Sequence, residues 1–205
     1  LNNPLAAILM NAQLLNSEEL PASARELART IEAEARRSAK IVGNLLSFAR
    51  PRPPERKAVA LNDVVRKAVD FHRYELAVAG VRLSEAYETG LPEVYCDPDQ
   101  VQQIVLNLVQ NARQAVDGRP DPEIRVATRR TNGSVEIVVE DTGPGIPADV
   151  RAHIFDPFFT TRTHSGGTGL GLFVVHQIVR EHGGEIEAGG EPGRGARFTV
   201  RLPIG

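Results

Sequence analysis

Residues 102–115 read QQIVLNLVQNARQA, and this stretch decides how the rest of the chain is interpreted. Its apolar residues recur at helical spacing, whereas Gln103, Asn107 and Asn111 stand four residues apart and share one face of the predicted helix. An amide among apolar neighbours is costly unless it is hydrogen-bonded. The stripe therefore has two interpretations: a solvated helix face, or the floor of a ligand pocket in which an amide oxygen binds a hard cation such as Mg²⁺.

A carboxylate and two glycines follow the strand predicted at 134–140. The sequence reads DTGPGI over 141–146, so Asp141 leaves the strand end beside Gly143 and Gly145, whose lack of a Cβ permits unusual backbone conformations. A carboxylate placed there can accept a hydrogen bond from the exocyclic amine of adenine, and it repels the oxygen that guanine presents at that edge. The alternative interpretation is an ordinary turn.

A second glycine cluster, GGTGLGL over 166–172, leads into the helix predicted at 170–182. Glycines let backbone N–H groups approach an anion closely, and a helix N-terminus favours negative charge. No lysine follows Lys67, so this is not a P-loop. A flexible linker is the alternative. The preceding segment 155–162, FDPFFTTR, offers aromatic side chains for a hydrophobic plug, together with hydroxyls and Arg162 that could face phosphates.

The composition excludes several classes of protein. The chain has 205 residues, is 41% hydrophobic and 24% charged, and carries a net charge of −2, so nothing in its bulk charge suggests nucleic-acid binding. No apolar run approaches the roughly 18 residues that a membrane span needs. The single cysteine, Cys96, cannot form an internal disulfide, and the five histidines do not cluster in the sequence. We therefore expect a globular protein of the reducing cytoplasm.

The periodicity predicts two regions of different kind. Residues 3–15 and 23–49 read as helices with apolar stripes; since two such helices cannot close a core alone, we expect a dimeric four-helix bundle. PRPP at 51–54 reads as a stiff linker. The rest predicts an α/β layer sandwich, a mixed sheet with helices on one face. Its expected helices are 61–78, 98–117 and 170–182, and its expected strands are 81–87, 93–96, 123–131, 134–140, 185–189 and 196–202.

Taken in order, these motifs resemble the catalytic core of bacterial sensor histidine kinases. Residues 103–112 are similar to the N box of that family, 141–145 to its first glycine box, 155–159 to its F box and 167–172 to its second glycine box. The first residues, LNNPLAAI, resemble the segment just after the phosphorylated histidine in kinases of the nitrogen-regulation type. NARQA and FDPFFTTR point to the same subgroup, and the resemblance covers nearly the whole chain.

The resemblance implies an α+β fold made of a helical hairpin, which forms a dimeric four-helix bundle, followed by an α/β sandwich domain. Residues 1–50 would be the dimerisation and phosphotransfer hairpin, truncated at its N-terminus, 51–56 a linker, and 57–205 an ATP-binding domain of the Bergerat (GHKL) type. The implied activity is transfer of the γ-phosphoryl group of Mg-ATP to a histidine and then to an aspartate of a response regulator. It also implies a homodimer through the N-terminal helices, a receiver domain as partner, no nucleic acid, and a membrane only through regions outside this chain.

The resemblance also implies roles for individual residues. Asn111 would bind Mg²⁺, Asp141 would bind adenine, and residues 160–171 would form a mobile lid over the phosphates. The full set of implied ATP-binding residues is Asn107, Asn111, Asp141, Gly143, Gly145, Ile146, Phe158, Thr160, Thr161, Arg162, Gly167, Thr168, Gly169, Leu170 and Gly171.

Asn107 distinguishes between related activities. ATP-hydrolysing relatives usually carry a glutamate at this position that activates water, and an amide cannot act as a general base. The implied pocket therefore suits phosphoryl transfer to a protein. A free-standing ATPase of the same superfamily and a nucleotide-binding pseudokinase or scaffold are the alternatives.

Three positions bear on how far the family's residue roles apply to this chain. The family pattern places His-Glu just before Leu1, so we expect the phosphoacceptor upstream of this sequence and no autophosphorylation of the chain at the usual site. Asn3 would orient water against the phospho-aspartate of the regulator, a phosphatase role; the alternative is an exposed helix residue. Ala196 stands where relatives often have Thr or Ser, which puts one water-mediated adenine contact in doubt.

Overall fold

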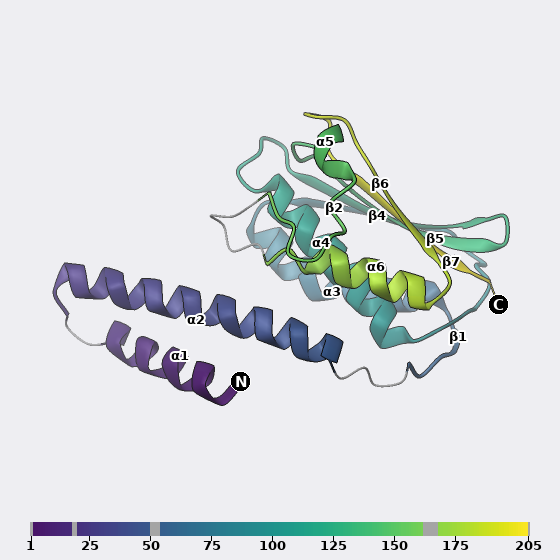
Figure 1. The fold of residues 1–205 in the computed structure, drawn as a ribbon. Helices are drawn as coiled ribbons and strands as arrows, with labels where there is room; N and C mark the ends of the chain where they lie inside the picture. The colour runs from purple at the N-terminus through teal and green to yellow at the C-terminus, as the bar shows by residue number, and fades with distance from the viewer. Residues whose placement is uncertain (1, 18–19, 50–53, 162–167, 205) are drawn as a thin grey trace. The chain divides into compact units, whose positions relative to one another are not determined.

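The computed structural model describes residues 2–17, 20–49, 54–161 and 168–204 (Figure 1). These residues group into two compact units. The first contains the described residues of Leu1–Arg52 and Phe158–Leu170, and the second those of Pro53–Pro157 and Gly171–Gly205. The linker predicted at 51–54 lies outside the described residues except for Pro54, and the boundaries 1–50, 51–56 and 57–205 stay predictions.

The first unit contains a helical hairpin whose two helices pack through small side chains. Helix α1 (Asn2–Ser17) runs along α2 (Ala22–Ala49), and Ala12, Ala28 and Ala35 are buried. The larger apolar side chains remain exposed, namely Ile8, Met10, Leu14, Leu15, Leu27 and Ile31. The hairpin therefore forms as predicted, and these six described side chains stay uncovered within one chain.

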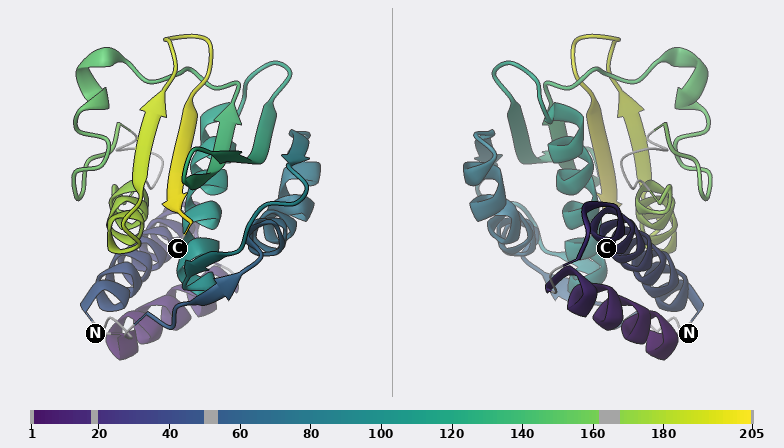
Figure 2. Two further views of the ribbon diagram at one scale, coloured as in Figure 1. Left: turned by 90° about the vertical axis from the view of Figure 1, so that its right-hand side faces the viewer. Right: turned by 90° about the vertical axis from the view of Figure 1, so that its left-hand side faces the viewer.

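The second unit is built on a five-stranded mixed sheet in the order β2-β4-β5-β7-β6 (Figure 2). Strand β2 is parallel to β4, and all other neighbours are antiparallel. A turn at Asn132-Gly133 joins β4 to β5, with Gly133 at φ +75°. The strands are β2 (Arg82–Tyr87), β4 (Glu123–Thr131), β5 (Ser134–Asp141), β6 (Glu185–Gly189) and β7 (Arg197–Pro203).

Three long helices cover one face of this sheet, as predicted (Figures 1 and 2). They are α3 (Leu61–Val78), α4 (Pro98–Val116) and α6 (Gly171–Glu181). Because strand side chains alternate in direction, every second residue of each central strand points into this layer. Each fully buried aliphatic side chain there stabilises the fold by roughly 1.5–3 kcal/mol. The layer includes Ile104, Leu108, Val126, Ile137, Val139, Val175 and Val200, all fully buried or nearly so.

The opposite face of the sheet carries arginine and glutamate side chains in register across β4, β5 and β7. The Glu136 carboxylate accepts hydrogen bonds from Arg129 Nε and Arg201 Nε, and its side chain is only 3% exposed. Burial raises the pKa of Glu136, but the hydrogen bonds from Arg201 and Arg129 outweigh this, so its net pKa lies below the usual glutamate value.

Two short elements were absent from the sequence-based expectation. Strand β1 (Lys57–Val59) pairs antiparallel with β3 (Val94–Cys96), and α5 (Ala148–Arg151) is a single turn after Pro147. Both are short and show no clear period of 2 or 3.6 residues, although β3, which is as short as β1, was expected at 93–96. None of the helices in the described ranges is long and apolar enough to cross a membrane.

Asp97 connects the first described residues of the second unit, the N-terminal end of α4 and the C-terminal end of α6. Its Oδ1 accepts from the N–H groups of Asp99 and Gln100, which caps α4, and its Oδ2 accepts from the Glu55 N–H. Its own N–H donates to Nε2 of the buried His182, whose Nδ1 donates to the Ile178 carbonyl. The His182 ring therefore bridges the backbone at the start of α4 and the backbone of α6.

Candidate functional site

The polar stripe of α4 faces the first residue of α6. Asn107 and Asn111 are half-buried, and among the described residues neither amide has a hydrogen-bond partner. A Cβ added at Gly171 would lie 3.8 Å from Asn107 Oδ1 and 3.9 Å from both amide atoms of Asn111. The N-terminal end of α6 therefore lies against the two amides. This placement favours a pocket floor over a purely solvated helix face, because amide oxygens and a positive helix end can together hold a phosphate and its cation.

Asp141 is buried at the end of β5, and backbone groups fix its carboxylate. Oδ1 accepts from the N–H of Gly143 at 2.8 Å and from the N–H of Ala196 at 3.3 Å. The backbone N–H of Asp141 donates to the Ala196 carbonyl at 2.9 Å. Ala196 thus supports the carboxylate through its main chain, whatever its side chain. These contacts hold the carboxylate in one orientation.

The glycines beside Asp141 leave no room for a side chain. A Cβ at Gly143 would lie 2.6 Å from Asp141 Oδ1 and 2.8 Å from the Cβ of Ala115. Gly145 has φ +79°, and a Cβ there would lie 2.1 Å from the carbonyl oxygen of Glu191. A side chain at either glycine would displace these neighbours, and the base pocket that the resemblance implies for Gly143 and Gly145 stays a prediction. Ile146, the next residue, is buried.

The ends of the predicted lid meet in the first unit. The Phe158 N–H donates to the Gly169 carbonyl at 3.0 Å, and a Cβ at Gly169, with φ +66°, would lie 2.4 Å from the Phe158 carbonyl carbon. Thr168 Oγ1 accepts from the Leu170 N–H at 3.4 Å, and Leu170 is buried. Thr161 is exposed and Thr160 half-buried. Arg162 and Gly167 lie outside the described residues.

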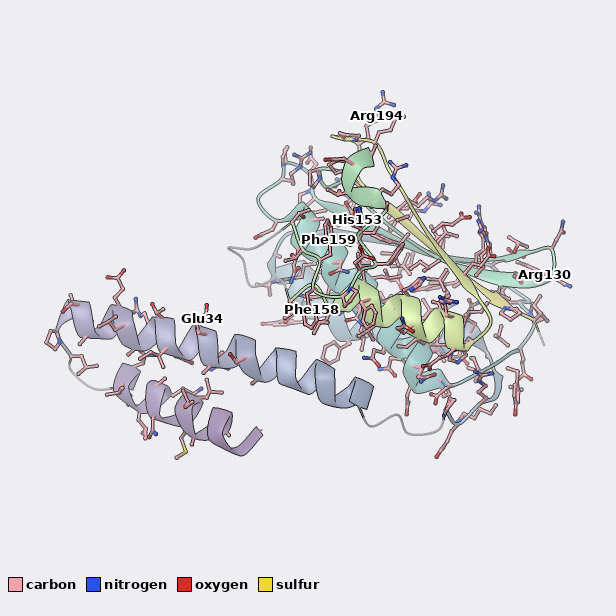
Figure 3. The ribbon with its side chains drawn as sticks, viewed as in Figure 1. Glu34, Arg130, His153, Phe158, Phe159 and Arg194 are labelled. Atoms are coloured by element: carbon pink, nitrogen blue, oxygen red, sulfur yellow. The ribbon has the colours of Figure 1, made fainter. Side chains whose placement is uncertain are left out.

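The aromatic residues of 155–159 do not form one plug. Phe158 has φ +65° and is 61% exposed, while Phe155 stacks on the half-buried His176 with ring centroids 5.4 Å apart. Figure 3 labels Phe158 and Phe159 among the side chains of this region. His176 therefore packs against an aromatic ring at the edge of the core.

The donors available to a metal ion are few. No group of three or more His, Cys, Asp or Glu side chains able to hold a metal occurs in the part of the chain that the structure describes. Mg²⁺ in nucleotide sites uses one or two protein oxygens and completes its shell with phosphates and water. A single amide oxygen such as Asn111 Oδ1 meets that requirement once a nucleotide is present.

Sequence reasoning did not single out the turn 190–196 or Arg151 as parts of this region. The turn between β6 and β7, residues 190–196, lies against 141–145, and its glycine spacing was the one available signal. No sequence pattern marked Arg151, which contacts this turn. Asn3 lies in the first turn of α1, but its side chain is outside the described part of the chain.

Two family models match the chain, and each covers one end of it. The model described as "Histidine kinase-, DNA gyrase B-, and HSP90-like ATPase" matches residues 96–205, more than half of the chain. The model described as "His Kinase A (phospho-acceptor) domain" matches residues 1–54.

Curated relatives match over the full chain. The chain is 37% identical over 221 residues to the sensory histidine kinase/phosphatase NtrB of Rhizobium leguminosarum bv. phaseoli, covering 99% of the chain and 55% of the relative. It is 37% identical over 206 residues to the sensor histidine kinase ZraS of Escherichia coli O157:H7, covering 100% and 44%. The chain spans about half the length of the curated relatives it matches.

Solved structures of similar fold are also histidine kinases. Full-length ShkA in complex with AMPPNP aligns with a TM-score of 0.79 at 27% identity, covering 99% of this chain and 43% of that one. Histidine kinase ThkA in complex with the response regulator protein TrrA aligns with a TM-score of 0.76 at 25% identity, covering 99% and 58%. The chain belongs to the histidine kinase, DNA gyrase B and HSP90-like ATPase family, and with its phospho-acceptor region it is a sensor histidine kinase core.

Proposed function

We propose that this chain binds Mg-ATP in the second unit and serves phosphoryl transfer, first to a histidine expected just before Leu1 and then to an aspartate of a response regulator. The observation that carries the proposal is the placement of the Asn107 and Asn111 amides against the N-terminal end of α6, 3.8 and 3.9 Å from the position of a Gly171 Cβ. A helix N-terminus and two side-chain amides at one place suit a phosphate with its cation.

Asp141 is assigned to the adenine end of the nucleotide. Its carboxylate accepts from the N–H groups of Gly143 and Ala196, so its orientation is fixed before the ligand arrives. A preoriented carboxylate accepts from the exocyclic amine of adenine at little entropic cost. Guanine presents an oxygen at this edge, so the site selects ATP over GTP.

Asn111 and Asn107 are assigned to the phosphate end. Asn111 Oδ1 would hold Mg²⁺, which would supply positive charge to offset that of the phosphates. Asn107 orients its amide beside the same phosphates and cannot remove a proton from water. Thr160, Thr161, Thr168 and residues 169–171 would close over the phosphates from the lid, together with Arg162 and Gly167. The chain's own contribution is positioning and exclusion of water, which favours transfer to a protein over hydrolysis.

The N-terminal hairpin is assigned to dimerisation and to the response regulator. Exposed Ile8, Leu27 and Ile31 form apolar surface that a second copy would cover. The match of residues 1–54 to a phospho-acceptor domain and the ThkA–TrrA complex support a dimer and a regulator partner. Asn3 would orient the water that hydrolyses the phospho-aspartate, in keeping with the name kinase/phosphatase carried by one relative.

The pocket is tested with Asp141→Asn and Asn111→Asp. Mg-ATP raises the melting temperature of wild type by linkage, and each variant should reduce the rise. The amide oxygen introduced by Asp141→Asn can still accept the two backbone hydrogen bonds, so the melting temperature of that variant without nucleotide should stay near that of wild type. Its affinity for ATP should fall at least about tenfold, or about 1.4 kcal/mol. An unchanged rise in both variants contradicts the pocket assignment.

The transfer step is tested on the chain extended to its native upstream residues. After incubation with γ-labelled Mg-ATP, we expect an acid-labile, base-stable phosphate on the protein, which a purified receiver domain then removes. ATP consumption without bound phosphate would favour an ATPase instead. Binding without either outcome would favour a scaffold or a phosphatase alone.

A further inference from the structure

We propose that Arg151 is a positioning residue for nucleotide binding, holding the turn 190–196 against the adenine pocket. This inference rests on the proposed function, since it concerns how the same pocket keeps its shape. It assigns a role to helix α5, a single turn that follows Pro147 and ends at Arg151.

The turn 190–196 lies directly against Asp141, the residue assigned to adenine. A Cβ at Gly195, where φ is +86°, would lie 1.8 Å from the Asp141 carbonyl oxygen, so the two backbones are in direct contact. The Gly193 N–H donates to the Pro144 carbonyl at 2.7 Å, and the Ala196 N–H donates to the Asp141 carboxylate. The second half of the turn is therefore tied to 141–145 by backbone hydrogen bonds.

Arg151 ties the first half of the turn. Its Nη2 donates to the carbonyl of Gly190 at 2.8 Å and reaches the carbonyl of Ile146 at 3.4 Å. One guanidinium thus bridges the turn and the buried end of the 141–146 segment. Figure 1 shows α5 beside the turn between β6 and β7, where this bridge lies. Gly190 itself has φ +127°, and a Cβ there would lie 2.3 Å from the Gly195 carbonyl oxygen, so the two ends of the turn touch.

A charged donor on a backbone carbonyl is stronger than a neutral one. Arg151 is exposed on its outer side, so its removal leaves no cavity in the core. Its loss should release Gly190 and let the turn move away from Asp141. The nucleotide then has to order the turn when it binds, and this cost appears as weaker affinity.

The chain offers a matched control in Arg194. It lies on the same turn and pairs with Glu191 at 3.3 Å, with both side chains more than 70% exposed. Figure 3 shows it projecting outward from the tip of the turn. Such a surface pair contributes little, so Arg194→Ala removes the same charge from the same region without touching the pocket.

The experiment compares wild type, Arg151→Ala, Arg151→Lys and Arg194→Ala by calorimetric titration with AMPPNP and with ADP in the presence of Mg²⁺. We expect Arg151→Ala to weaken both nucleotides by about fivefold, or about 1 kcal/mol, and Arg194→Ala to leave affinity unchanged. Arg151→Lys should recover part of the loss, since an ammonium can still reach one carbonyl. In the upstream-extended protein, the KM for ATP should rise while kcat stays constant.

Each outcome decides between the two proposals. If wild type binds neither nucleotide, the proposed function fails. If wild type binds and Arg151→Ala binds equally well, only the role of Arg151 fails. If Arg194→Ala loses as much affinity as Arg151→Ala, the positioning role also fails. It fails as well if Arg151→Lys recovers no affinity and the melting temperature of Arg151→Ala without nucleotide falls together with its affinity.

Discussion

At the scale of single residues, two glycines of one turn differ in what surrounds them. Gly193 and Gly195 have φ values of +83° and +86°, so an alanine at either position is strained by the same backbone conformation. A Cβ at Gly193 meets nothing within 4 Å, whereas at Gly195 it would lie 1.8 Å from the Asp141 carbonyl oxygen. Comparing alanine at Gly193 with alanine at Gly195 therefore separates the cost of backbone strain from the cost of a steric clash with Asp141.

We expect Gly193→Ala to lower the free energy of unfolding by about 1 kcal/mol, the usual cost of a left-handed alanine. Gly195→Ala should cost at least about 2 kcal/mol more and should also weaken ATP binding, because the turn has to move away from Asp141. Urea denaturation and nucleotide titration of both variants measure these effects. Equal losses in the two variants would mean that the close approach at Gly195 does not matter.

At the scale of elements, the contact between Asp97 and His182 sets the start of α4 against the end of α6. Further along α4 lie the amides of Asn107 and Asn111, and the N-terminal end of α6 lies against them. Asp97 also receives the Glu55 N–H, so the chain enters the second unit at this contact. The His182 ring joins the Asp97 N–H to the Ile178 carbonyl, so loss of this side chain leaves both backbone groups without their partner.

We expect His182→Ala to lower the free energy of unfolding by about 2 kcal/mol, because it leaves the Asp97 N–H and the Ile178 carbonyl without this partner. His182→Gln should lose less, since its amide can both accept and donate. Asp97→Asn should retain the cap through its side-chain oxygen. Denaturant unfolding at neutral pH ranks the three, and a glutamine variant as unstable as the alanine variant would contradict the hydrogen-bonding account.

The charged face of the sheet predicts a pH dependence. The pKa of Glu136 is lowered in the folded state, since the hydrogen bonds from Arg201 and Arg129 outweigh the effect of burial. Its contribution to stability is therefore fully present above the ordinary glutamate value of 4.5 and is lost as the pH falls below it through the folded pKa.

We expect Glu136→Gln to cost about 2 kcal/mol of stability at pH 7 and progressively less as the pH falls below 4.5. Glu191→Gln, which alters an exposed pair, serves as the control and should cost almost nothing at either pH. Unfolding curves over this pH range test the prediction. A cost for Glu136→Gln that is independent of pH would rule out ionisation as its source.

At the scale of the whole molecule, the hairpin leaves its larger apolar side chains uncovered. Among its side chains that the structure describes, the buried ones are alanines, while Ile8 is 47%, Leu27 65% and Ile31 47% exposed. Surface of this kind on an amphipathic hairpin is typical of a subunit interface. We infer that a second copy covers it in solution.

The expected result is a dimer of the wild-type chain and a shift towards monomer in the double variant Ile8→Glu/Ile31→Glu. Arg29→Glu, also on the exposed part of α2, should leave the mass unchanged. Sedimentation equilibrium measures the masses, and ATP titration should show that the monomeric variant keeps its nucleotide affinity. A monomeric wild-type chain would refute the proposed interface.

The sequence by itself determined the long helices, the five strands of the central sheet and the four motifs, since periodicity and glycine spacing are local properties. It predicted Asn107, Asn111, Asp141, Gly143 and Gly145 as one site only through their resemblance to a family. It missed β1 and α5, which are short and show no clear period.

Only the tertiary structure decided which of these residues meet. Gly171 lies against Asn107 and Asn111 because α6 packs beside α4, and Ala196 supports Asp141 because β7 pairs with β5. Arg151 reaches Gly190 across 39 residues of sequence. Contacts of this kind depend on sheet order and helix packing, which arise from burial of the whole core. No local pattern of residues carries that information, so the sequence supplied the chemical groups and the fold supplied their geometry.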